Sequence, residues 1–207
     1  HSVKPLVADF LAERGLTLSE EKTKITHIKD GFDFLGFNVR KFGDTLLTQP
    51  SKDRTKRMLS KVKDEIKRFR GDAQHELIMR LNPILNGWAN YYKHSAASNV
   101  FRKTDYQIYK KLWRWALRRH GNKCKGWIKN RYFHRIDGRD WVFAVKRKNE
   151  KHEEYFIPIT ILFNTKIERY PQLKCDVNPF DPEWKQYLEK RRTAKMKMSL
   201  KGKRSLI

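Results

Sequence analysis

The fold is decided by residues 56–71, KRMLSKVKDEIKRFRG. Met58, Leu59, Val62, Ile66 and Phe69 form one apolar stripe at helical spacing, and most of the remaining positions hold lysine or arginine. Gly71 follows as a helix terminator. The stretch therefore predicts an amphipathic helix that buries an apolar face and exposes a basic one.

The segments that follow have the same helical period. Residues 73–80 predict a second helix, and Asn82-Pro83 resembles an N-cap with proline at the first helical position, which predicts a restart through Tyr92. Residues 99–119 predict another long helix. Short links between amphipathic helices are typical of a helical bundle. The expected core residues of this bundle are Trp88, Tyr92, Leu112 and Trp115.

Strand patterns flank the predicted bundle. Before it, residues 3–14 have helical spacing with Gly15 as a cap, and short strands are expected at 16–18, 24–28 and 32–40, with a turn at Asp30-Gly31. After it, β-rich runs occupy residues 141–145, 155–157 and 159–163, and a basic helix is expected from residue 183. The predicted fold class is α+β and mainly α: a helix with a β-hairpin, a three-helix bundle, a small β-rich module and a basic C-terminal helix.

The positive charge is concentrated in two segments. The chain has 207 residues and a formal net charge of +24, of which +17 lies in residues 51–135 and +7 in residues 183–207. Its twelve Phe, eight Tyr and six Trp are too many for a disordered polybasic tail. No apolar run is long enough to span a membrane, and the N-terminal residues lack a signal-peptide pattern. The charge therefore indicates a polyanionic partner, most simply nucleic acid.

The sequence offers no catalytic centre. Two adjacent glutamate pairs, Glu20-Glu21 and Glu153-Glu154, lie in polar surroundings typical of turns, whereas nucleotidyl transfer needs carboxylates that hold divalent metal ions. His120 and Cys124 have a spacing that two metal ligands can use, but two ligands do not make a site. We therefore expect no metal site and no catalytic residue in this chain.

Basic and aromatic residues alternate through the predicted bundle, a pattern that suits phosphate contacts and base stacking. Arg114, Arg118 and Arg119 form one charged strip on a helix, and a bundle core needs none of them. The candidate RNA-binding residues are Lys56, Arg57, Lys63, Lys67, Arg70, Lys93, Arg114, Arg118, Arg119, Lys125, Lys129 and Arg131.

Several motifs resemble those of group II intron-encoded reverse transcriptases and maturases. Gly31-Phe-Asp-Phe-Leu-Gly-Phe37 resembles the end of the palm, and Leu81-Asn-Pro-Ile-Leu-Asn-Gly-Trp-Ala-Asn-Tyr-Tyr92 is similar to the maturase-specific motif. Leu112-Trp-Arg-Trp-Ala-Leu-Arg-Arg-His120 continues in register, and residues 178–184, NPFDPEW, resemble the segment before the DNA-binding and endonuclease region. Gly121, where the family often has proline, and Asn86, where it often has arginine, depart from the pattern.

The resemblance implies four segments. Residues 1–49 correspond to the end of the palm, 50–135 to the thumb and domain X, 136–182 to a β-rich extension of domain X, and 183–207 to a basic tail leading towards a DNA-binding or endonuclease region. Phe34, Leu35, Gly36 and Phe37 resemble the primer-grip hairpin. The family's catalytic aspartates, which bind Mg²⁺, belong to a Tyr-Ala-Asp-Asp type motif that this sequence lacks.

The resemblance implies that the chain is the RNA-binding thumb and maturase portion of such a protein, active in splicing, reverse transcription and retrohoming. The parent protein would be an RNA-directed DNA polymerase, but we expect this chain to be inactive alone. The expected partners are group II intron RNA, an RNA–DNA template-primer, target DNA and an upstream palm and fingers polypeptide, without a membrane and in the cytoplasm or an organellar equivalent. The alternative is a DNA-binding module of a mobile-element nuclease.

Overall fold

The computed structural model describes residues 3–69, 71, 73–168 and 177–193. The chain divides into two compact units, His1–Arg169 and Tyr170–Ile207. The described residues form helices and two small antiparallel sheets of three strands each, which confirms the mixed α and β class expected from the sequence. Both sheets and all the long helices belong to the first unit.

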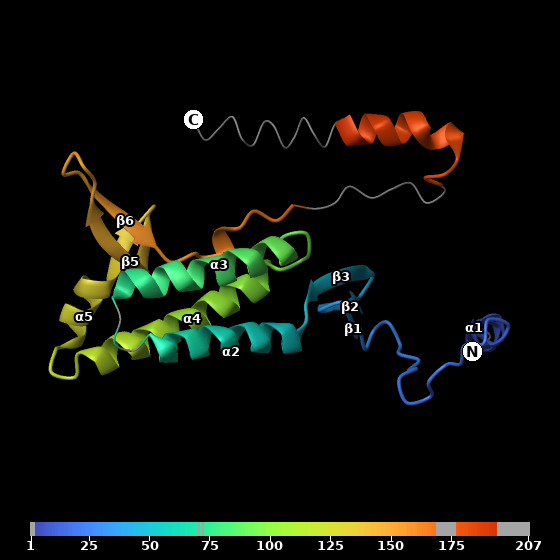
Figure 1. Cartoon of the computed structure of the whole chain (residues 1–207), viewed down its shortest axis with the longest axis horizontal. Helices are drawn as coiled ribbons and strands as arrows, with labels where there is room; N and C mark the ends of the chain where they lie inside the picture. The colour runs from blue at the N-terminus through green and yellow to red at the C-terminus, as the bar shows by residue number, and fades with distance from the viewer. Residues whose placement is uncertain (1–2, 70, 72, 169–176, 194–207) are drawn as a thin grey trace. The chain divides into compact units, whose positions relative to one another are not determined.

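Three long helices form the centre of the first unit: α2 (Lys52–Arg68), α3 (Gln74–Tyr92) and α4 (Ser98–Arg119) (Figure 1). Helix α2 begins at Ser51, whose hydroxyl accepts the Arg54 backbone N–H at 3.3 Å, and it buries Met58, Val62 and Ile66. Helix α4 buries one face, formed by Phe101, Thr104, Ile108, Leu112, Trp115 and Ala116. The apolar stripes read from the sequence are therefore the faces that pack into the core.

The predicted break at Asn82-Pro83 is wrong, because α3 continues through Pro83. Proline removes the N–H that would bond to the Met79 carbonyl, but Leu81 and Leu85 on either side are fully buried and hold the helix in place. The Asn82 side chain does not cap a helix. Its amide nitrogen donates to the Pro158 carbonyl at 3.1 Å, and its oxygen accepts the Thr160 N–H at 2.8 Å.

The first sheet precedes the bundle. Its strands β1 (Phe32–Phe34), β2 (Phe37–Phe42) and β3 (Thr45–Pro50) pair in the order β1-β2-β3, and helix α1 (Val3–Ala12) lies before them in the chain. Gly15 has a φ of +69° and follows α1 in the conformation of a C-terminal cap, as expected. The strands expected at 16–18 and 24–28 are wrong. These residues pair with no strand in the part of the chain that the structure describes, and Leu16 and Ile25 are largely exposed.

The second sheet follows the bundle. Helix α5 (Lys125–Tyr132) leads directly into β4 (Phe133–Ile136), which pairs with β5 (Arg139–Lys148) and then β6 (Glu154–Pro158) in the order β4-β5-β6. The two predicted β-rich runs at 141–145 and 155–157 therefore lie in strands. The Gln74 side chain joins this sheet to the start of α3, since its amide nitrogen donates to the carbonyls of Tyr132 and Ala144.

Residues 159–168, which we call the strap, cross the bundle instead of forming the strand expected at 159–163. Asp105 of α4 accepts the backbone N–H groups of Leu162 and Phe163, each at 2.9 Å, and Leu162 begins the short helix η1 (Leu162–Asn164). Burial raises the pKa of the Asp105 carboxyl, while these two hydrogen bonds oppose the shift. The strap ends on α3, where the Glu168 N–H donates to the Lys93 carbonyl at 2.9 Å.

The second unit contains a short helix, η2 (Pro182–Trp184), followed by a helix over 185–193. Asp181 accepts the Glu183 backbone N–H at 3.0 Å and so caps the start of η2. The basic helix expected from residue 183 is present as far as residue 193, and its remaining expected length, like Arg70, lies outside the described residues.

Candidate nucleic-acid interface

A groove of about 580 Å³ lies between α2 and α4, and six of its eight lining side chains are cationic. Ile66 and Trp115, both buried, are its apolar residues. We call it the basic groove, and its cations are Lys63, Lys67, Lys111, Arg114, Arg118 and Arg119. The local sequence explains this arrangement, because positions next to the buried stripes of both helices hold lysine or arginine.

The basic groove has no carboxylate to balance its charge. No acidic residue lines it, and Lys63, Lys67, Lys111, Arg114 and Arg118 make no ion pair within the described residues. Burial, followed by the neighbouring charges of Lys63 and Arg114, lowers the pKa of the Lys111 ammonium below its ordinary value. Like charges held this close repel one another, so an anion bound among them would relieve the repulsion.

One end of the groove is fixed by hydrogen bonds to the link after α2. The Trp115 indole N–H donates to the Phe69 carbonyl at 3.0 Å, and an Arg119 guanidinium nitrogen donates to the Gly71 carbonyl at 3.1 Å. The same guanidinium lies over the Trp115 ring, 5.2 Å from its centre. Arg119 is therefore positioned by the fold, whereas the remaining cations of the groove extend from exposed or partly exposed positions.

The structure brings together five of the twelve candidate RNA-binding residues in this groove: Lys63, Lys67, Arg114, Arg118 and Arg119. Arg57 is paired with Asp53 at 2.8 Å on α2, and Lys93 is paired with Glu168 of the strap at 3.2 Å. Lys93 thus also holds the strap. Lys56 lies exposed on α2. Lys125, Lys129 and Arg131 lie on α5, outside the groove lining.

Lys111 is the groove residue that the sequence analysis missed. It precedes Arg114 by three positions and Arg118 by seven, which places all three on one face of α4. That spacing is visible in the sequence, so a search for basic residues at helical spacing would have found it.

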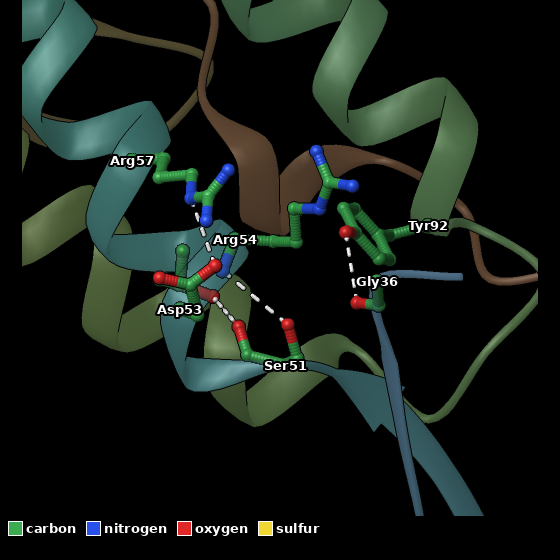
Figure 2. A network of polar contacts seen from close by, with 7 residues as sticks. Gly36, Ser51, Asp53, Arg54, Arg57 and Tyr92 are labelled. Carbon is green, nitrogen blue, oxygen red and sulfur yellow. Dashed lines mark hydrogen bonds and ion pairs between the residues drawn. The ribbon is translucent and has the colours of Figure 1, made fainter. Parts of the chain in front are cut away.

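The four residues that resemble a primer grip form a turn docked on the bundle. Figure 2 shows the Tyr92 hydroxyl donating to the Gly36 carbonyl, at 3.0 Å, with the Arg54 side chain extending beside the tyrosine ring. The Ser51 N–H donates to the same carbonyl at 2.9 Å, and the Tyr91 hydroxyl donates to the Leu35 carbonyl at 2.8 Å. Leu35 and Phe34 stay exposed, whereas Phe37 stacks on Tyr91 with ring centres 5.2 Å apart.

Gly36 permits this close approach. Its φ is +85°, and a Cβ there would lie 3.0 Å from the Tyr92 hydroxyl and 3.1 Å from the Arg54 Cγ. A second groove of about 650 Å³ opens beside the turn, lined by Leu35 and by three cations, Arg54, Arg57 and Lys61. Burial, with a further contribution from Tyr91, raises the pKa of the Tyr92 hydroxyl, and Arg54 partly opposes this shift.

Gly36→Ala is expected to destabilise the protein by about 2–3 kcal/mol, because alanine adds left-handed backbone strain and a steric clash. The matched control is Gly43→Ala, where φ is +56° but nothing lies within 4 Å of the added Cβ, so only the backbone strain applies. Urea unfolding of both variants measures the difference. Equal losses of stability would contradict the docking of the turn against Tyr92 and Arg54.

The four residues expected in the bundle core differ in burial. Tyr92, Leu112 and Trp115 are buried, and Trp88 is partly buried against the same core. Trp88 packs between Tyr92 and Phe101, with ring centres 4.9 and 5.3 Å away. These contacts join the end of α3 to the start of α4.

No group of three or more His, Cys, Asp or Glu side chains that could hold a metal ion occurs in the described part of the chain. Among the same residues, no helix is both long and apolar enough to cross a membrane.

The fold and the groove define a helical module with a polycationic surface. Residues 55–133 match the family model described as "Group II intron, maturase-specific domain", in agreement with the sequence resemblance. The match covers α3, α4 and α5, nearly all of α2, and every cation of the basic groove. This segment is therefore similar to group II intron maturases. No curated protein gives a significant match to the chain.

Proposed function

We propose that the chain is the RNA-binding thumb and maturase portion of a group II intron reverse transcriptase, and that the basic groove grips the phosphate backbone of intron RNA. The observation that carries the proposal is the set of six cations, contributed by α2 and α4 without an acidic partner lining the groove, inside the matched domain. Lysine and arginine bind phosphate oxygens through charge-assisted hydrogen bonds.

The geometry favours recognition of shape and charge over recognition of sequence. Two helices supply the cations at helical spacing, and Arg119 is held by Gly71 and Trp115, so the positive charge of the groove lies along two rigid elements. Contacts to phosphates position a nucleic acid but carry little sequence information. We therefore assign to this groove the gripping of a folded RNA, which assists splicing by stabilising the active structure of the intron.

The second groove supports an extension of the proposal to template-primer binding in reverse transcription and retrohoming. Arg54, Arg57 and Lys61 line it beside the turn that resembles a primer grip. The turn is anchored by the hydroxyls of Tyr91 and Tyr92, and this anchoring would hold the exposed Phe34 and Leu35 in a fixed position towards a bound duplex. The Mg²⁺-dependent polymerisation step would require the aspartates that this sequence lacks.

A competition experiment separates this proposal from a DNA-binding module. The full chain is bound to a fluorescein-labelled group II intron RNA at fixed salt, and unlabelled intron RNA or duplex DNA of equal phosphate content is added. The proposal expects the RNA to compete more strongly at every concentration. Stronger competition by duplex DNA would overturn it in favour of the nuclease module.

The salt dependence of RNA affinity measures how many phosphates the groove contacts. With six cations in the groove, the logarithm of the association constant is expected to fall with the logarithm of salt concentration with a slope of about −5. Fluorescence anisotropy at a series of potassium chloride concentrations gives this slope. A slope of about −1 or shallower would mean that the groove is not occupied by RNA phosphates.

A further inference from the structure

Trp141 has a backbone conformation that tryptophan rarely adopts. Its φ is +63°, within the left-handed region, and it follows the tight turn at Asp137-Gly138, where both φ values are also positive. His134 pairs with Val142 and Ile136 pairs with Arg139, so β5 has one extra residue in this interval. Trp141 therefore lies in a β-bulge, a feature that changes the direction of a side chain and is frequent next to functional sites.

The core accounts for only part of this conformation, since the Trp141 ring packs against buried Phe133 with ring centres 6.1 Å apart. Val142 and Phe143, which follow Trp141, are buried, but Trp141 itself is 42 % exposed. Glycine would adopt the same backbone without strain, whereas a bulky residue in a sparsely populated region carries an energetic cost. The fold keeps a large aromatic ring at the surface despite that cost, which points to a role for the ring.

Trp141 extends a line of aromatic rings on α4, which we call the aromatic strip: Tyr106, Tyr109, Trp113 and Trp141. Tyr109 and Trp113 lie 6.2 and 5.6 Å from Trp141 between ring centres, and Tyr106 stacks with Tyr109 at 6.5 Å. With about 100° of rotation per helical residue, the rings on α4 point about 80–180° away from the groove residues Lys111, Arg114 and Arg118. The strip and the basic groove therefore occupy different faces of the same helix.

Cations lie over the exposed rings of the strip. The Lys129 ammonium is 5.0 Å from the centre of the Trp141 ring, and the Lys110 ammonium is 5.1 Å from that of Tyr106. A hollow of about 360 Å³ next to Trp141 is lined by Lys129 and Asn130, and by Arg135, which pairs with Asp140 at 3.7 Å. An aromatic face, an ammonium group and a side-chain amide thus meet at one place on the surface.

We propose that the aromatic strip, centred on Trp141, is a stacking site for unpaired bases of RNA. A base would stack on the exposed indole, Lys129 would contact the adjoining phosphate, and the Asn130 amide would reach the edge of the base. A duplex cannot use this site, because its bases are already stacked on one another. The inference rests on the proposed RNA-binding function. It adds that one face of α4 binds the phosphate backbone and another face binds unpaired bases.

The test compares single-stranded and duplex RNA of equal phosphate content, using the full chain and labelled oligonucleotides of about 12 phosphates. Trp141→Ala is expected to weaken binding of the single strand by about tenfold and binding of the duplex by less than about twofold. Trp141→Phe keeps an aromatic face and is expected to recover most of the loss. The matched control is Phe163→Ala, which removes another exposed ring with a cation over it, Arg102 at 4.7 Å, outside the strip.

Trp141→Gly separates the ring from the strained backbone. Glycine relieves the strain, so this variant is expected to be at least as stable as Trp141→Ala and to lose single-strand affinity to the same extent. Normal single-strand binding by Trp141→Gly would overturn the proposal, because the loss in Trp141→Ala would then come from the backbone.

The outcomes also distinguish this inference from the proposed function. Unchanged single-strand affinity in Trp141→Ala, with duplex binding still present, would overturn the stacking site alone. Equal losses for both RNAs would assign Trp141 a structural role and would likewise overturn the site. Failure of the wild-type chain to bind either RNA would overturn both the proposed function and the stacking site.

Discussion

The Arg114→Glu/Arg118→Glu double variant is expected to lose about a hundredfold in affinity for folded intron RNA at roughly 0.1 M salt. Both side chains line the basic groove, are exposed, and make no ion pair in the described part of the chain. Each phosphate contact raises the association constant about tenfold when the salt concentration falls from 1 M to 0.1 M. The new carboxylates also repel the RNA phosphates. Fluorescence anisotropy with a labelled intron RNA measures the loss, and the salt slope is expected to fall by about two.

The matched control for this variant is Arg147→Glu/Lys148→Glu. It makes the same change in net charge at two exposed positions on β5, outside the groove lining. The control is expected to lose less than about fivefold, because only the long-range field of the protein changes. Similar losses in the two double variants would mean that net charge alone attracts the RNA, and would contradict a binding role for the groove. Circular dichroism and thermal unfolding check that both variants remain folded.

The helical bundle was predictable because local periodicity and tertiary packing agree. Met58, Val62 and Ile66 lie on one stripe of the sequence and on the buried face of α2. Pro83 shows where local rules fail. A proline after asparagine is a helix-start signal by itself, but here the burial of Leu81 and Leu85 outweighs the lost hydrogen bond. The Asn82 side chain bonds to the end of β6 and to the strap.

The strand predictions depended on partners that lie far away in the sequence. The run at 159–163 has β propensity, yet it forms the strap, because Asp105 on α4 accepts two of its backbone N–H groups. Propensity alone cannot anticipate a side-chain acceptor more than fifty residues away. The bulge at Trp141 depends likewise on the register between β4 and β5, which the sequence does not specify directly.

The candidate site was predictable in residue type but not in arrangement. Helical spacing placed Arg114 and Arg118 on one strip, whereas the distance between this strip and the cations of α2 depends on how the two helices pack. The same limit explains Arg57 and Lys93. Arg57 pairs with Asp53, and Lys93 pairs with Glu168 of the strap, so part of their positive charge is balanced within the protein. A count of basic residues therefore overestimates the number that converge on one surface.

The largest expected effect on stability belongs to Phe101→Ala, which should lower the free energy of unfolding by about 3–5 kcal/mol. Phe101 is fully buried in the first turn of α4, and its ring lies 5.3 Å from that of Trp88 on α3. Removing the ring leaves a cavity where these two helices meet, and the surrounding rings can relax only in part. Because a domain has only about 5–15 kcal/mol of stability, the thermal midpoint should fall by about 10 °C.

The matched control for Phe101→Ala is Phe180→Ala, which deletes the same ring at a position that is 93 % exposed. It is expected to change stability by less than about 0.5 kcal/mol. Urea and thermal unfolding of both variants give the comparison. A loss below about 1 kcal/mol for Phe101→Ala would contradict a well-packed joint between α3 and α4. RNA binding by this variant, measured well below its thermal midpoint, should stay close to that of the wild type, because Phe101 lies outside the basic groove and its loss lowers affinity only through the unfolded fraction.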